Sequence, residues 1–559
     1  MVVDYTLIQS EQSQDIEKLS ARITRPTSRR IAVTAILCLA SVAFFSALLA
    51  SKKHKKEPKR NVIMMISDGF GPASETFARQ YYSWKEDLPV NTVFPLDKIL
   101  VGTSRTQSSS SLITDSAAGA TAFSCAIKTY NGAIGVNPDE VPCGTVLESA
   151  KIHRNMKTGL VVKSRVTHAT PAAFSAHVGW RDWENQIAEH QVGYTPLGRT
   201  VDLMFGGGLC EFLSNKTEKS CRLDDRDLLQ DAKQDFGWNW IKSRQEFDQL
   251  KPKDTQLPLM GLFAPHHMDF AIDNNPSVQP TLPEMTTKAL DILKASTKDA
   301  KEGFFLMVEA SRIDMAGHIN DPATQLREVW EYQQTVNAVM EFVKANPGTV
   351  LVATSDHETG GLTVGRQVTE GYPEYEWKPE ALTQMKRSSE VLTWQWMQAI
   401  SEGKDTREFL VETIIKDGTG VQDPTDAEID QLWTWKEKNV TYDFFATALA
   451  DIVSKRAELG VVYKPDSVAK YKLIAFEQWT TMGHTAVDVN LYAYGHQSKL
   501  LRGNHENTDI GDFIVDYLNL DLDDITKKLN RDSQFIANIK AQKEMASGVN
   551  SKHYIQYKD

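Results

Sequence analysis

Short apolar runs that recur along the chain constrain its fold more than any other feature of the sequence. The first, Asn61–Ile66, is continuously apolar after its first residue, which is typical of a strand buried on both faces of a parallel sheet. Helical patterns lie between the runs, for example at residues 322–344. This alternation predicts an α/β fold with a large, mostly parallel central sheet between helices, a three-layer αβα arrangement. The other strand-like runs are residues 159–163, 201–205, 304–308 and 350–354.

Acidic residues and histidines follow several of these runs directly. In open α/β sheets, ligands bind at the carboxyl ends of the strands. An Asp and a His four residues apart, such as Asp314 and His318, can point the same way on a helical turn, as a metal pair requires. Each residue alone is explained as well by a turn or a satisfied side chain, but together they predict a metal site. The candidates are Asp68, Glu309, Asp314, His318, Asp356, His357 and His484.

Ser116 is the candidate nucleophile. It follows Asp115 and precedes a run of small residues within 112–122, a pattern that places it at a helix N-terminus, where unpaired N–H groups favour an anion. No histidine lies nearby in the sequence to act as its base, so activation by a metal is the better prediction. The alternative for this stretch alone is an alanine-rich helix capped by Asp or Ser.

The length and net charge of the chain limit its possible domain organisation and its possible partners. A chain of 559 residues can bury a large core, as one large α/β domain or two smaller ones. Its net charge of -11 argues against a nucleic-acid partner, which requires a basic face.

The N-terminal segments predict a membrane anchor. Residues 1–30 are polar and typical of a disordered tail, and residues 31–50 form an uncharged apolar run long enough to span a bilayer as a helix. The linker 51–60 is basic, so both flanks are basic and the positive-inside rule does not decide the orientation.

Sequons and cysteines favour a lumenal position for the part of the chain beyond the linker. Asn215 and Asn439 each stand in an Asn-x-Thr sequon. Apart from Cys38 in the apolar run, the cysteines form two short-range pairs, which fit an oxidising compartment, although four unrelated buried thiols are the alternative. We therefore expect a type II membrane protein. The pairs are Cys125 with Cys143 and Cys210 with Cys221.

Residues 370–475 interrupt the α/β rhythm. They are rich in Trp, Glu, Lys and Gln and have a helical pattern, in which Asp417-Gly418 is expected to stop a helix. We interpret them as an insertion or cap within a domain spanning residues 61–540. Residues 486–494 then alternate like a strand and precede a polar helical tail, with 541–559 as the C-terminal end.

Taken together, these motifs resemble the alkaline phosphatase family, and they are most similar to its membrane-anchored vacuolar branch. The similarity runs from about Asn61 to the C-terminal helix. The motifs are Asp68-Gly69, 114–118, 128–132, the stretch from Val308-Glu309 through Asp314 to His318, 355–358, 483–485, and for the branch 167–173 and 504–508.

The resemblance implies two zinc ions, one magnesium ion and a phosphoserine intermediate on Ser116 in the hydrolysis of phosphate monoesters. It also implies broad specificity, a homodimer and a vacuolar membrane location. Arg181 matches the phosphate-binding arginine of the family. By position, the first zinc would bind Asp314, His318 and His484; the second Asp68, Asp356, His357 and Ser116; and magnesium Asp68, Glu309 and Thr170, with His168 in the magnesium region.

Two positions depart from the family pattern. Position 168 is His where some branches have Asp, which should weaken magnesium binding, and position 315 is Met where a Lys or His is usual. Two other functions remain open: a phosphodiesterase or nucleotide pyrophosphatase of the same metallo-superfamily, in which Arg181 would occupy the space of the second ester group, and an inactive phosphate-binding scaffold. A sulfatase is disfavoured because no Cys/Ser-x-Pro-x-Arg stretch surrounds Ser116.

Overall fold

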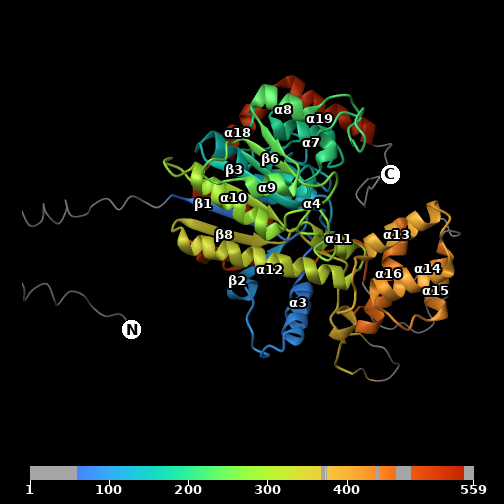
Figure 1. The fold of residues 1–559 in the computed structure, drawn as a ribbon. Helices are drawn as coiled ribbons and strands as arrows, with labels where there is room; N and C mark the ends of the chain where they lie inside the picture. The colour runs from blue at the N-terminus through green and yellow to red at the C-terminus, as the bar shows by residue number, and fades with distance from the viewer. Residues whose placement is uncertain (1–58, 367–371, 373, 436–440, 461–479, 547–559) are drawn as a thin grey trace, which may run out of the picture. The chain divides into compact units, whose positions relative to one another are not determined.

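A computed structural model describes residues 59–366, 372, 374–435, 441–460 and 480–546 (Figure 1). The tail 1–30, the apolar run 31–50 with Cys38, and the sequon at Asn439 lie outside these residues. Among the helices in the described part, none combines the length and apolar character needed to cross a bilayer.

The centre of the fold is a ten-stranded sheet in the order β12-β2-β11-β8-β1-β7-β3-β4-β6-β5. Strand β1 lies between β7 and β8 and is parallel to both, whereas β11 is antiparallel to its neighbours β8 and β2. The predicted mostly parallel sheet is thus confirmed. The strands are β1 Asn61–Ile66, β2 Leu100–Arg105, β3 Lys157–Arg165, β4 Leu203–Gly207, β5 Asn239–Ile241, β6 Leu259–Leu262, β7 Phe304–Glu309, β8 Thr349–Thr354, β11 Val489–Gly495 and β12 Gly503–Glu506.

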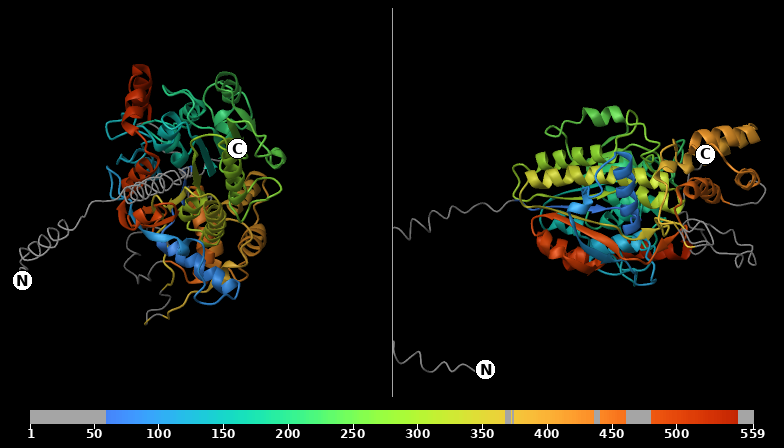
Figure 2. Two further views of the ribbon diagram at one scale, coloured as in Figure 1. Left: turned by 90° about the vertical axis from the view of Figure 1, so that its left-hand side faces the viewer. Right: turned by 90° about the horizontal axis from the view of Figure 1, so that it is seen from below.

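Both faces of the sheet carry an apolar core, because successive side chains of a strand point to opposite sides. In β1, Ile63 and Met65 join one core, while Val62, Met64 and Ile66 join the other. Helices α3 (Pro72–Lys85), α10 (Leu282–Ser296) and α12 (Pro322–Ala345) cover the first face. Helices α5 (Val146–Ile152), α8 (Leu228–Phe236) and α17 (Asn507–Leu518) cover the second. Figure 2 shows this three-layer arrangement from two further sides.

The predicted strands are present, with shifted ends. The run 201–205 starts at Leu203 in β4. Asp202, just before the strand, accepts through its carboxylate from Lys151 Nζ and Arg199 Nη1, each at 2.7 Å. The predicted strand 486–494 corresponds to β11, Val489–Gly495, and the predicted helix 322–344 to α12. A separate two-stranded sheet, β9 (Glu358–Thr359) with β10 (His484–Thr485), lies beside the main one.

The insertion 370–475 is helical where it is described, as predicted, but the predicted helix stop at Asp417-Gly418 is wrong. The π-helix η4 continues through both residues, and the left-handed Gly420, at φ 82°, ends it. Gly418 instead permits close packing, since a Cβ there would lie 2.3 Å from Leu392 Cδ2. The elements are η3 Pro379–Leu382, α13 Ser389–Ser401, α14 Arg407–Phe409, η4 Leu410–Thr419, α15 Asp426–Trp433 and α16 Tyr442–Ala457.

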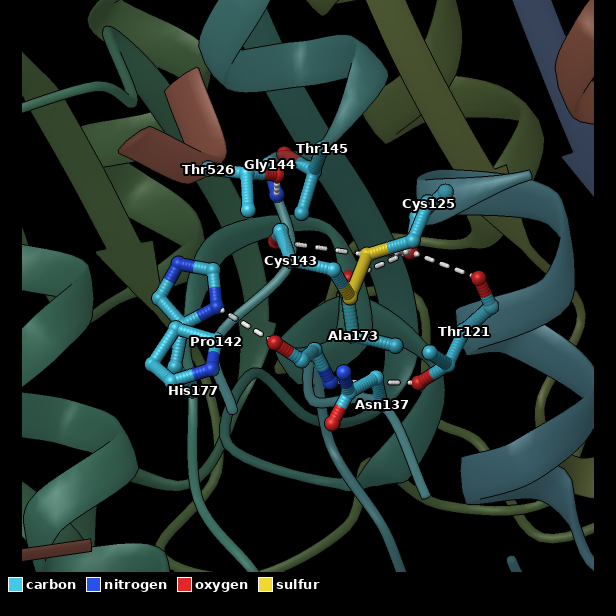
Figure 3. The surroundings of a disulfide bond; sticks show 12 residues. Thr121, Cys125, Asn137, Pro142, Cys143, Gly144, Thr145, Ala173, His177 and Thr526 are labelled. Carbon is cyan, nitrogen blue, oxygen red and sulfur yellow. Dashed lines mark hydrogen bonds between the residues drawn. A yellow bond between two sulfur atoms is a disulfide. The ribbon is translucent and has the colours of Figure 1, made fainter. Parts of the chain in front are cut away.

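Two disulfides join the predicted cysteine pairs, which excludes four unrelated thiols. Cys125–Cys143 ties the last residue of α4 (Ser116–Cys125) to the segment that precedes α5 (Figure 3). On that segment, the Gly144 N–H donates to Thr526 Oγ1 at 2.8 Å. The second bond is Cys210–Cys221. The first bond therefore fixes the far end of the helix that begins at Ser116.

Candidate active site

The strand order brings the predicted acidic residues to one edge of the sheet. Because Ile66 of β1 is in register with Glu309 of β7 and Thr354 of β8, the residues that follow these strands emerge side by side. Asp68, Asp356 and His357 are completely buried there, as is Glu309. The order of the strands thus brings these residues together, whereas the sequence predicts only that each one follows a strand.

Ser116 starts helix α4, as predicted, with Asp115 as its N-cap accepting from the Ala118 N–H at 3.0 Å. Its Oγ lies 3.0 Å from His357 Nε2 and 3.4 Å from Asp68 Oδ1. The small residues of the helix allow this approach, since a Cβ on Gly119 would lie 2.9 Å from Asp356 Cβ. The fold therefore places a histidine beside Ser116 although none is near it in sequence.

Asp314, His318 and His484 form a second group. Asp314 and His318 lie on α11 (Arg312–His318), with His318 Nε2 3.2 Å from Asp314 Oδ2. His484 Nε2 lies 3.2 Å from His318 Nε2 and 3.6 Å from Asp314 Oδ1. The Nδ1 atoms of the two histidines face the carbonyls of Met482 at 2.5 Å and Thr114 at 2.8 Å. Since Nδ1 then carries the proton of a neutral ring, the two Nε2 lone pairs face each other and suit a shared cation.

Three sets of possible ligand atoms, each within 4.8 Å of one another, occur along this edge: Asp68 with Asp356 and His357, Asp68 with His168 and Glu309, and Asp314 with His357 and His484. The first two agree with the expected second zinc and magnesium positions, including His168. The third differs, because it contains His357 where the resemblance implies His318. Imidazole with carboxylate suits zinc, whereas oxygen atoms suit magnesium.

The electrostatics of these groups fit cations. Burial, with the nearby carboxylate of Asp356, raises the pKa of Asp68 well above its usual range, and burial raises the pKa of Glu309 to about 7. Burial likewise raises the pKa of Asp356 to about 7. Asp68 Oδ2 and Glu309 Oε1 are buried and accept no hydrogen bond from the part of the chain that the structure describes. The hydroxyl of Thr170, completely buried on α6 (Ala169–Ser175), favours the ionised form of Glu309.

A cavity of about 240 Å³ opens beside Ser116. Arg181 lies on its wall, with Nη1 donating to Asp115 Oδ2 at 3.1 Å and Nη2 lying 3.2 Å from His168 Nε2. The guanidinium is therefore held at two points before any ligand arrives. Its planar donors can bind two oxygens of one phosphoryl group.

Three acidic or basic residues of the cavity wall were not predicted from the sequence: Arg312, Glu390 and Asp443. Arg312 donates through Nη2 to Glu390 Oε1 at 2.9 Å, and its Nη1 lies 3.2 Å from Met315 Sδ. Glu390 lies on α13 and Asp443 on α16, so the insertion forms part of the cavity wall. Met315 is uncharged where the family usually has Lys or His, but the guanidinium of Arg312 lies next to its side chain. Arg312 stands next to the predicted motif and could have been noticed, but no signal in the sequence links it to Glu390.

Comparisons with known proteins agree with this geometry. The family model described as alkaline phosphatase matches residues 59–520. An alkaline phosphatase of Schizosaccharomyces pombe is 47% identical over 88% of each chain, and the repressible alkaline phosphatase of Saccharomyces cerevisiae is 42% identical over 96% of this chain and 95% of its own. The crystal structure of a cold-active alkaline phosphatase from Shewanella sp. is 30% identical, with a TM-score of 0.65 over 82% of this chain and 99% of that one. That of the Thermus thermophilus enzyme is 26% identical, with a TM-score of 0.67 over 83% and 92%. The chain therefore belongs to the alkaline phosphatase family and is an enzyme that hydrolyses phosphate monoesters.

Proposed function

We propose that this enzyme hydrolyses phosphomonoesters through a phosphoserine on Ser116, at a site for two zinc ions and one magnesium ion. The observation that carries the proposal is the position of Ser116 Oγ, at a helix N-terminus and within 3.4 Å of both Asp68 Oδ1 and His357 Nε2. The buried, unpartnered oxygens and the histidine nitrogens that face one another support the presence of cations.

The chain's own residues position the reaction. Arg181 binds two non-bridging oxygens of the phosphoryl group and directs the phosphorus toward Ser116. Ser116 Oγ attacks in line and releases its proton to solvent, the bond between phosphorus and the ester oxygen breaks, and the alcohol leaves with a proton from solvent. Water then attacks the phosphoserine, which restores Ser116 and releases inorganic phosphate. When bound, the metals would lower the pKa of the hydroxyl and neutralise charge that develops on the leaving oxygen.

By position, Asp314, His318 and His484 would hold one zinc, and Asp68, Asp356, His357 and Ser116 the other. Asp68, Glu309 and Thr170 would hold magnesium, with His168 beside them. Since binding centres on the phosphoryl group, we expect broad specificity for the alcohol. A phosphodiester would need space for a second ester group next to Arg181, which the Asp115 and His168 contacts hold in place.

The test is an acid-quenched reaction with a ³²P-labelled monoester. Labelled phosphate should be recovered on Ser116, and Ser116→Ala should abolish the label, whereas Ser109→Ala, an exposed serine upstream of the same helix, should not. Label on another residue would refute the mechanism. The metal content of the purified chain gives a second readout: His318→Ala should lower bound zinc, and Glu309→Gln should lower bound magnesium with less effect on zinc.

We also propose a lumenal catalytic part, a type II anchor at 31–50, a vacuolar membrane location and a homodimer. The exposed Asn215 and the two disulfides support an oxidising compartment. Glycosidase should shift the protein on a gel, and the shift should vanish when Asn215 and Asn439 are both replaced. Protease added to intact vesicles should remove only residues 1–30; digestion of the large domain would reverse the topology. Light scattering during size exclusion tests the dimer.

A further inference from the structure

The charged side chains on the cavity wall are almost all paired. Arg181 is bound to Asp115 at 3.1 Å, and Arg312 to Glu390 at 2.9 Å. Asp314 faces His318 at 3.2 Å and belongs to the metal ligands. The remaining charged wall residue is Asp443, whose carboxylate makes no ion pair with any side chain in the described ranges of the chain. Among the described residues of the wall outside the metal centre, Asp443 is thus the one acidic side chain without an ion pair.

Asp443 lies where it can contact the alcohol portion of a phosphate ester. It is half-buried at the second position of α16, and the cavity it lines also contains Ser116 and Arg181. Apolar side chains of Met315, Ile319 and Met482 complete this part of the wall. The alcohol of a phosphoryl group bound by Arg181 therefore lies in a cavity whose wall combines apolar side chains with the Asp443 carboxylate and the paired Arg312.

A structural role for Asp443 is the alternative. An acidic residue in the first turn of a helix is favourable because of the helix dipole, and Asp426 and Glu428 occupy that turn in α15. That role is satisfied anywhere on the surface, so it gives no reason for the carboxylate to line the cavity that contains the nucleophile. It also predicts that Asn, which lacks the charge, lowers the thermal midpoint without changing the preference among substrates, which makes the two roles separable.

We infer that Asp443 is a specificity-determining residue that binds a positive charge on the leaving alcohol, so that the insertion favours phosphomonoesters of cationic alcohols. This inference rests on the proposed monoesterase mechanism and adds a substrate preference to it. A partly desolvated carboxylate attracts a cation more strongly than an exposed one, while the apolar wall contacts the carbon atoms around that cation. The fixed negative charge should likewise disfavour alcohols that carry a carboxylate.

The experiment compares two esters of the same shape, phosphocholine and 3,3-dimethylbutyl phosphate, which differ only by carbon in place of the charged nitrogen. The quaternary charge does not titrate, so alkaline assays leave it unchanged. For the metal-loaded wild-type chain, we expect kcat/KM to be about threefold to tenfold higher for phosphocholine. Raising the ionic strength should reduce the ratio because salt screens the partly exposed pair.

Variants locate the preference. Asp443→Asn should bring the ratio close to one, and Asp443→Lys should invert it. Glu408→Gln removes the same charge from an exposed position on α14 and should leave the ratio as in wild type. An Asp443→Asn chain that keeps the wild-type ratio would overturn the inference, whether or not its thermal midpoint falls. If the wild-type chain hydrolysed neither ester, the proposed function itself would be wrong.

Discussion

The pair between Arg312 and Glu390 yields the most demanding test of the link between the insertion and the metal site. Their side chains are 2% and 3% exposed, and the Arg312 Cζ lies 3.5 Å from the centroid of the Phe270 ring. Removing one partner of a buried pair costs about 3–5 kcal/mol, because the other charge stays buried alone. Replacing both with apolar residues of similar size is often neutral.

We therefore expect strong non-additivity in a double-mutant cycle. Arg312→Met should lower the free energy of unfolding by about 3–5 kcal/mol. Glu390→Leu should cost less, since the ring of Phe270 still stabilises the guanidinium by up to about 2 kcal/mol. The double variant should lose about 3 kcal/mol less than the sum of the two single losses, which is the coupling energy of the pair. Because Arg312 is the first residue of α11, each single variant should also release zinc faster.

Urea unfolding of the metal-loaded chain, with zinc release followed by a chromogenic chelator, measures both effects. The control is the surface pair of Lys416 and Glu412 in the same insertion, whose side chains are 30% and 57% exposed at a separation of 2.7 Å. Its coupling energy should stay below about 0.5 kcal/mol. If the losses at Arg312 and Glu390 simply added up in the double variant, the reasoning from the buried pair would be refuted.

Three further predictions follow from single positions. Gly69→Ala should lower bound zinc strongly, since a Cβ at this φ of 72° would lie 2.5 Å from Asp314 Cα; Gly198→Ala, at φ 68° with nothing within 4 Å, should cost only backbone strain and keep the zinc. Burial raises the pKa of Asp273 to about 6, so its ionisation destabilises the folded chain progressively above pH 4, and fully once the pH exceeds 6. Asp273→Asn should thus raise the free energy of unfolding at alkaline pH by about 1–3 kcal/mol, measured by urea unfolding. No gain at alkaline pH, or an equal gain at low pH, would contradict this assignment. Met315→His should lower the inhibition constant of inorganic phosphate several-fold near neutral pH, where imidazolium is partly populated, and an unchanged constant would mean that a neighbouring cation or water already makes the contact.

The parts of the fold that could be predicted are the central strands. Strands β1, β7 and β8 are buried on both faces, so their apolar runs are uninterrupted and recognisable. Strand β2 is partly exposed and β12 is polar, and both lie at one end of the sheet, where no such run is needed. Their pairing with each other is fixed by segments far apart in the chain, which local patterns do not encode.

The site residues likewise fall into those that the sequence could place and those that it could not. Asp68, Glu309 and Asp356 could be placed from their strands, whereas the assignment of each ligand to one metal rested on the family resemblance. The contact between Arg312 and Glu390 depends on how the insertion folds back. The error at Gly418 is instructive, because a glycine that ends a helix and one that permits close packing look alike in sequence.

The sheet order also determines when the molecule can be completed during its synthesis. Among the strands that the structure describes, β2 pairs only with β11 and β12, which lie near the other end of the chain. At about 5–20 residues per second, the roughly 380 residues between β2 and β11 take on the order of 20–80 seconds to be made. His484 emerges in the same late segment. The two disulfides, which join residues 18 and 11 positions apart, can close much earlier. The nascent chain can therefore contain both disulfides while it still lacks strands β11 and β12 and the predicted metal ligand His484.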